Sequence, residues 1–129
     1  MMADMNVPHV PMSWGEVIDK ITILEVKTVR LSTEAARANA AKELKLLRDI
    51  AAPVMANAEV SDLASRLKVL NESLWEIEEC IRAHERAANF DDKFIGLARA
   101  VYHQNDERGA IKRELNLMLG SDLVEEKSY

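Results

Sequence analysis

The stretch 63-LASRLKVLNESLWEIEECI-81 decides the fold that this sequence predicts. Its apolar residues recur at alternating steps of four and three, the spacing of a helix that packs one face against a partner helix. These residues are Leu63, Leu67, Leu70, Leu74, Ile77 and Ile81. The pattern predicts a long helix from about residue 61 to residue 88, with Ser61 and Asp62 as its N-terminal cap.

Capping and turn residues predict three more helices around this stretch. The expected ranges are 13–31, 33–51 and 92–119. Ser13 and Glu16 have the S-x-x-E spacing of a capping box at the start of the first helix. Pro53 is expected to end the second helix and to open a linker over 52–60. Gly120 follows the last helix, in the position where glycine is favoured.

Four helices with short connections predict an all-α fold, namely a four-helix bundle built from a short helical hairpin packed on a long antiparallel hairpin. The chain has only four glycines and three prolines, too few for the frequent turns of an all-β domain. A single helical domain is expected over 1–129, in which residues 1–12 form an extended lead-in and residues 121–129 form a C-terminal tail.

Composition narrows the function classes. The chain has 129 residues, of which 48% are hydrophobic and 30% charged, as in a self-folding globular domain. A net charge of −5 and the lack of a basic run argue against nucleic-acid binding. No apolar run approaches the ~18 residues of a membrane span, and no signal-peptide pattern is present. The single cysteine, Cys80, excludes an internal disulfide and fits a reducing compartment, so a cytoplasmic location is expected.

The last expected helix carries polar side chains where its apolar stripe should continue. Steps of three and four predict one inward face, and three successive positions on it are polar, two of them cationic. In chain order the face reads Phe94, Ala98, Val101, Asn105, Arg108, Lys112, Leu115 and Leu119, with Asn116 beside it. A helix built only for packing would have leucine at the polar positions, so this cluster is a candidate site.

The first expected helix places one carboxylate, Glu25, within its apolar arc. Glu16 and Asp19 fall on the side that is expected to face solvent. A carboxylate that faces a core is costly unless a cation or several donors meet it. Glu25 is therefore expected to pair with Arg108 or Lys112.

Two explanations of the polar cluster stay open. In the structural explanation, Arg108 and Lys112 neutralise an acid in a buried network that fixes helix register, the candidate acids being Glu25, Glu78 and Glu85. In the functional explanation, part of this positive charge is left over to hold an anion. Arginine suits that role because its planar fork meets a carboxylate or phosphate with two hydrogen bonds.

A polar stripe beside the seam of the third helix also has two interpretations. Its members are Asn71, Trp75, Glu78, Arg82 and Glu85. It is either a solvated flank, with Glu78 and Arg82 as a helical ion pair, or the wall of a cavity, since a tryptophan among charges often marks a recessed surface. The candidate ligand-binding residues of the whole sequence are Glu25, Glu78, Arg82, Asn105, Arg108, Lys112 and Asn116.

Neither a metal nor a cofactor is expected. The three histidines lack ligand spacing with one another or with Cys80. Acidic spacings that begin at Glu16 and Glu76 are similar to half-motifs of helical magnesium-dependent nucleotide pyrophosphohydrolases, but the last helix turns cations inward instead of acids. An inward set of arginine, lysine and glutamate is also similar in style to the active site of helical chorismate mutases, which hold a dicarboxylate without a cofactor.

Several blocks together resemble a family of small all-helical bacterial proteins of unknown function. The blocks are SWGEVIDKITILEVK (13–27), LWEIEECIR (74–82), FDDKFIGLARAVYHQNDERGAIKRELN (90–116) and GSDLVEEKSY (120–129). The resemblance implies a compact helical fold, a cytoplasmic location and an accessory or interaction role, with no assigned activity.

The favoured hypothesis is a binding or interaction module whose polar cluster holds a small anionic ligand or a group of a protein partner. One alternative is a cofactor-free enzyme on a carboxylate or phosphate substrate, with Arg108 and Lys112 as electrostatic stabilisers and Glu25 as acid or base. A second alternative is a structural subunit that forms a homodimer. Partners among nucleic acids and membranes are not expected.

Overall fold

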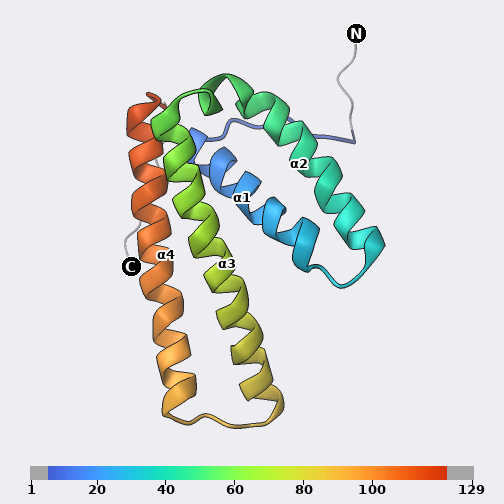
Figure 1. Ribbon diagram of the computed structural model, residues 1–129, viewed down its shortest axis with the longest axis vertical. Helices are drawn as coiled ribbons and strands as arrows, with labels where there is room; N and C mark the ends of the chain where they lie inside the picture. The colour runs from blue at the N-terminus through green and yellow to red at the C-terminus, as the bar shows by residue number, and fades with distance from the viewer. Residues whose placement is uncertain (1–5, 122–129) are drawn as a thin grey trace.

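The computed structural model describes residues 6–121, which form four α-helices joined by short loops (Figure 1). They are α1 (Trp14–Arg30), α2 (Glu34–Met55), α3 (Ala58–Arg86) and α4 (Asp92–Met118). These described residues contain no strand, so the predicted all-α four-helix fold is confirmed. Residues 1–5 of the expected lead-in and 122–129 of the expected tail lie outside the described part of the chain.

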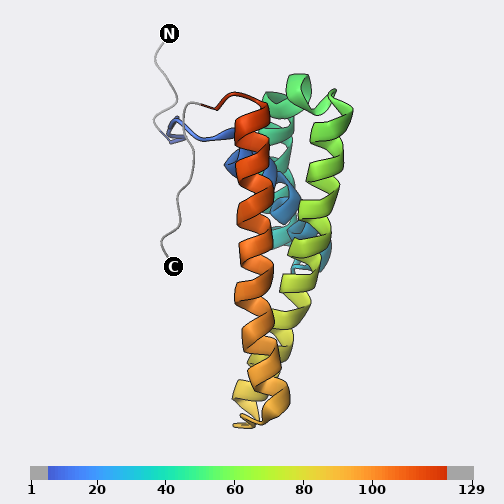
Figure 2. The ribbon, with the colours of Figure 1, turned by 90° about the vertical axis from the view of Figure 1, so that its left-hand side faces the viewer.

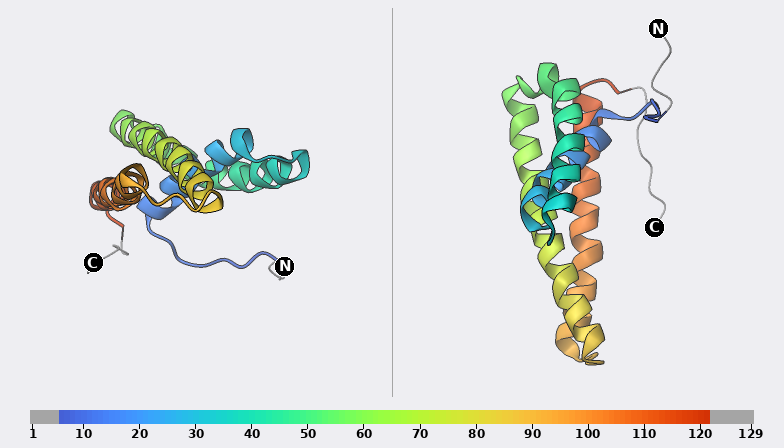
Figure 3. Two further views of the ribbon diagram at one scale, coloured as in Figure 1. Left: turned by 90° about the horizontal axis from the view of Figure 1, so that it is seen from below. Right: turned by 90° about the vertical axis from the view of Figure 1, so that its right-hand side faces the viewer.

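The helices form two hairpins of unequal length. α3 and α4 run side by side and project beyond α1 and α2, as Figures 1 and 2 show. α1 lies between α2 and the long hairpin and contacts each of the other three helices (Figure 3). No residue between Leu74 and Ile111 is buried, so the projecting part of α3 and α4 has no closed core.

Two apolar cores flank α1. On one side, Ile18 packs among residues of α3 and α4, including Leu67 and Leu115. On the other side, Ile21 and Leu24 pack against α2. α1 is therefore buried on two faces, which leaves little of its circumference for solvent.

The connection between α2 and α3 differs from its prediction. α2 continues through Pro53 to Met55, so this proline does not end the helix. It lies in the last turn and is exposed, so only the end of the helix loses a backbone hydrogen bond to the missing N–H. α3 begins with Asn57 as its cap, whose Oδ1 accepts from the N–H groups of Glu59 and Val60. The expected linker over 52–60 is thus wrong.

The start of α1 is capped largely by residues from the end of α4. Ser13 Oγ accepts from the Glu16 N–H at 3.3 Å, which confirms one half of the predicted capping box. The Gly15 N–H donates to Asn116 Oδ1 at 2.6 Å, and the Trp14 N–H donates to the Ser121 hydroxyl at 3.1 Å. The first two N–H groups of α1, which have no acceptor within the helix, are therefore satisfied across the molecule.

Gly15 permits this close approach of α1 to α4. A Cβ atom at Gly15 would lie 2.5 Å from the carbonyl oxygen of Lys112 and 2.9 Å from Asn116 Oδ1. Gly15→Ala is expected to lower the free energy of unfolding by about 1–3 kcal/mol, because the two helices must move apart.

The control is Gly96→Ala, in an exposed part of α4 where nothing lies within 4 Å of the added Cβ. It should raise the free energy of unfolding by about 0.5–1 kcal/mol through helix propensity. Urea titrations followed by circular dichroism measure both. Equal effects of the two substitutions would contradict the close-contact explanation.

The turn from α3 to α4 contains a left-handed alanine. Ala88 has φ +50°, and the chain around it forms the hydrogen bonds of a Schellman motif, from the Ala88 N–H to Glu85 O and from the Asn89 N–H to His84 O, each 3.0 Å. The preceding residue, Ala87, has ordinary right-handed helical angles.

Ala88→Gly is expected to raise the free energy of unfolding by about 0.5–1 kcal/mol, because glycine adopts positive φ without the steric cost that alanine bears. Ala87→Gly makes the same chemical change one residue earlier, where φ is −86°, and should be destabilising instead. Thermal unfolding of the two variants gives the signs. A loss of stability in Ala88→Gly would refute the interpretation.

Candidate ligand-binding pocket

A buried carboxylate, Asp19, joins α1, α3 and α4. Only 3% of the surface of Asp19 is exposed to solvent. Arg108 of α4 donates to it twice, from Nη2 to Oδ2 at 2.6 Å and from Nε to Oδ1 at 3.3 Å. Asn71 of α3 donates from Nδ2 to Asp19 Oδ1 at 3.0 Å and to Thr22 Oγ1 at 2.8 Å. We call Asp19, Thr22, Asn71 and Arg108 the crossing network.

The expectation that Asp19 faces solvent is wrong. Asp19 belongs to the buried face of α1 that packs against α3 and α4. A carboxylate is tolerated there because a guanidinium and an amide donate hydrogen bonds to it. Glu16, which lies one turn earlier, is partly exposed and accepts from Lys112 Nζ at 2.9 Å. The two inward cations of α4 are thus inward as predicted, but each meets a different acid from the one expected.

Glu25 pairs with neither of those cations. Its carboxylate accepts from Arg48 Nη2 of α2 at 2.7 Å, because Glu25 lies on the side of α1 that faces α2. Both residues line a pocket of about 230 Å³ between α1, α2 and α3. The three residues required by the enzyme hypothesis, Glu25, Arg108 and Lys112, are therefore not brought together.

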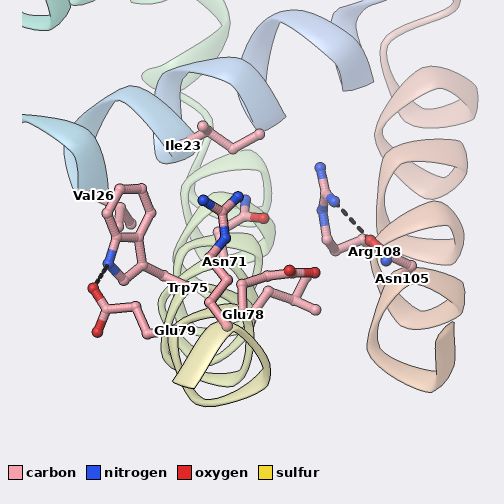
Figure 4. A pocket seen from close by; sticks show the side chains of 10 residues that line it. Ile23, Val26, Asn71, Trp75, Glu78, Glu79, Asn105 and Arg108 are labelled. Atoms are coloured by element: carbon pink, nitrogen blue, oxygen red, sulfur yellow. Dashed lines mark hydrogen bonds between the residues drawn. The ribbon is translucent and has the colours of Figure 1, made fainter. Parts of the chain in front are cut away.

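A larger pocket of about 460 Å³ lies where α1 crosses the long hairpin (Figure 4). α1 contributes two apolar residues, α3 contributes six residues and α4 contributes two polar residues. The lining consists of Ile23, Val26, Asn71, Leu74, Trp75, Glu78, Glu79, Arg82, Asn105 and Arg108. Four of the five residues of the polar stripe predicted on the third helix line it, all but Glu85, and Glu78 and Arg82 among them are also exposed to solvent.

The structure places the seven predicted ligand-binding residues at three locations. Glu78, Arg82, Asn105 and Arg108 line the large pocket. Glu25 lies at the smaller pocket, and Lys112 and Asn116 lie against the first turn of α1. Sequence reasoning missed the apolar wall contributed by α1, although its members recur at the three-residue step of a helix face.

The charged groups of the large pocket differ in how they are balanced. Arg108 is neutralised by Asp19, and its Nη1 donates to Asn105 Oδ1 at 2.8 Å. Glu79 accepts from Trp75 Nε1 at 2.8 Å, which fixes the indole ring along the pocket wall (Figure 4). Within residues 6–121, Arg82 and Glu78 form no ion pair with each other or with any other side chain.

The crossing network predicts strong coupling between its two charges. Asp19→Asn and Arg108→Met should each lower the free energy of unfolding by about 3 kcal/mol, because each leaves the other group buried without its counter-charge. The double variant should lose less than the sum of the single losses, with a coupling energy of about 1.5 kcal/mol or more.

Glu25→Gln and Arg48→Met form the matched control cycle. Their side chains are 23% and 55% exposed, against 4% and 19% for Asp19 and Arg108, so solvent screens the pair. A coupling energy below about 1 kcal/mol is expected there. Urea unfolding of all variants gives both cycles, and additivity in the first one would show that the buried pair does not hold the helices together.

Comparisons with known proteins place the chain in a family. No curated protein and no solved structure matches it. In the described part of the chain, no helix is long and apolar enough to cross a membrane, and no group of three His, Cys, Asp or Glu side chains is arranged to hold a metal ion. A family model with the description "Family of unknown function (DUF6165)" matches residues 8–129. The chain therefore belongs to this family, in agreement with the resemblance of its sequence blocks.

Proposed function

We propose that the protein is a binding module. Its pocket between α1, α3 and α4 holds a small molecule, or a side chain of a partner, that has an apolar body and one carboxylate. The observation that carries the proposal is Arg82, which lines this pocket and has no ion-pair partner among residues 6–121. A cation without a partner beside an apolar wall favours a ligand with these two parts.

The size and lining of the pocket support a small ligand. A volume of about 460 Å³ is within the range of small-molecule sites. Ile23, Val26 and Leu74 offer an apolar surface, and the indole of Trp75 is held in place by its hydrogen bond to Glu79. Such a rigid aromatic side chain binds an apolar body at little cost in conformational entropy.

The charges favour a carboxylate over a phosphate. Arg108 keeps unused N–H groups, but Asp19 already neutralises its charge. Arg82 is therefore the only lining cation in the described structure whose charge is not balanced by a direct partner, and Glu78 and Glu79 lie close to it along α3. Two carboxylates repel a multiply charged phosphate more strongly than a single carboxylate.

The same geometry favours binding over catalysis. The acid or base that the enzyme hypothesis needs, Glu25, is paired with Arg48 at a different pocket. The homodimer stays a prediction, to be checked by light scattering of the purified chain.

The proposal is tested by nuclear magnetic resonance with 3-phenylpropanoate as the probe. The chain has two tryptophans, Trp14 and Trp75, so it gives two indole N–H signals, which Trp75→Phe assigns. The Trp75 signal is expected to shift to saturation during the titration, while the Trp14 signal stays in place. Arg82→Gln should weaken binding about fivefold, equal to about 1 kcal/mol.

Arg86→Gln is the matched control, because it removes the same charge one turn further along α3 from an exposed residue outside the pocket lining. Its affinity for 3-phenylpropanoate should equal that of the unaltered chain. The proposal is wrong if 3-phenylpropanoate at about 10 mM, a concentration at which even very weak binding is detected, leaves the Trp75 signal in place. It is also wrong if Arg82→Gln and Arg86→Gln bind this probe equally well.

A further inference from the structure

Glu78 and Arg82 have an unusual relation for two residues one turn apart on a helix. A glutamate four residues before an arginine is the arrangement that ordinarily forms an ion pair along the helix surface. Here both residues are exposed and both line the large pocket, yet their charged groups are not within 4 Å of each other. One carboxylate and one guanidinium group thus lie at the same pocket, and each is available to a ligand.

The charge balance of the pocket also disfavours a ligand that carries only a negative charge. Because Asp19 neutralises Arg108, the charges that remain in the lining are those of Arg82, Glu78 and Glu79. A ligand with only a carboxylate would satisfy Arg82 and would leave its negative charge close to Glu78. A ligand that carries an ammonium group next to its carboxylate satisfies both side chains and meets no uncompensated repulsion.

An α-amino acid has this arrangement, because its ammonium and carboxylate groups are attached to one carbon atom. Side chains at i and i+4 have Cβ atoms about 5–6 Å apart, close enough to bind the two groups of one amino acid. The planar fork of Arg82 suits the carboxylate, and Glu78 suits the ammonium. The side chain of the ligand would then extend along the wall formed by Ile23, Val26 and Trp75.

We infer that the ligand of this pocket is a free α-amino acid with an apolar or aromatic side chain, bound as a zwitterion between Glu78 and Arg82. The inference rests on the proposed function, because it assigns the ligand class of the same pocket. It adds a role for Glu78, which recognises the ammonium group, to the carboxylate recognition already proposed for Arg82.

Three probes that differ by one group each test the inference. L-Phenylalanine carries both charges, 3-phenylpropanoate lacks the ammonium group, and 2-phenylethylamine lacks the carboxylate. Titrations followed at the Trp75 indole signal are expected to give an affinity for L-phenylalanine at least about fivefold above that for either of the other two.

Glu78→Gln separates the role of this residue from a general effect of charge. The variant should bind L-phenylalanine about fivefold more weakly, and 3-phenylpropanoate as well as or better than the unaltered chain. Glu85→Gln is the control, because Glu85 is exposed on the same stripe of α3 but is not part of the pocket lining. It should leave the affinities for all three probes unchanged.

The outcomes distinguish this inference from the proposed function. Equal binding of 3-phenylpropanoate and L-phenylalanine, each weakened by Arg82→Gln, would overturn the amino-acid assignment and support the carboxylate pocket. Equal binding of 2-phenylethylamine and L-phenylalanine would overturn both, because the carboxylate would then contribute nothing. Failure of all three probes to move the Trp75 signal would also overturn both.

Discussion

The burial of Asp19 is the constraint on which the arrangement of α1, α3 and α4 depends. A carboxylate removed from water requires a counter-charge and hydrogen-bond donors, and Arg108 and Asn71 supply them from the two helices of the long hairpin. Because these bonds form in only one register, they fix where α1 crosses the hairpin. Beyond that point α1 runs away from α4 toward the loop that leads to α2 (Figure 1), and the large pocket lies beside the crossing.

The crossing network also links the fold to the candidate site. Asn71 and Arg108 belong both to the network and to the pocket lining, so the same side chains that hold the helices present their remaining polar groups to the cavity. A ligand there would meet groups already positioned by buried hydrogen bonds, which reduces the entropy lost on binding. Arg82 and Glu78 differ, since they are exposed and free of ion pairs within the described residues.

The sequence predicted the elements and the pocket wall on α3 more accurately than the partners of individual charges. The stripe on α3 was identifiable because one helix face repeats at steps of three and four, and that face lines the pocket. Periodicity predicts a single apolar arc on α1 that leaves Asp19 outside it, whereas Ile18 and Ile21 belong to two different cores. The pairing of Glu25 depends on which helix lies beside it, and periodicity within one helix carries no such information. Two acceptable caps, Asn57 and Ser61, lie close together in sequence, and the structure uses the earlier one.

The cap of α1 has a consequence for the order in which the molecule assembles. The backbone groups at the start of α1 find their acceptors on Asn116 and Ser121, 101 and 107 residues further along the chain. During synthesis the first helix leaves the ribosome long before these acceptors exist, so the N–H groups of Trp14 and Gly15 stay bonded to water until the end of α4 emerges. Formation of the native junction between these two helices therefore waits until the end of α4 has been synthesised.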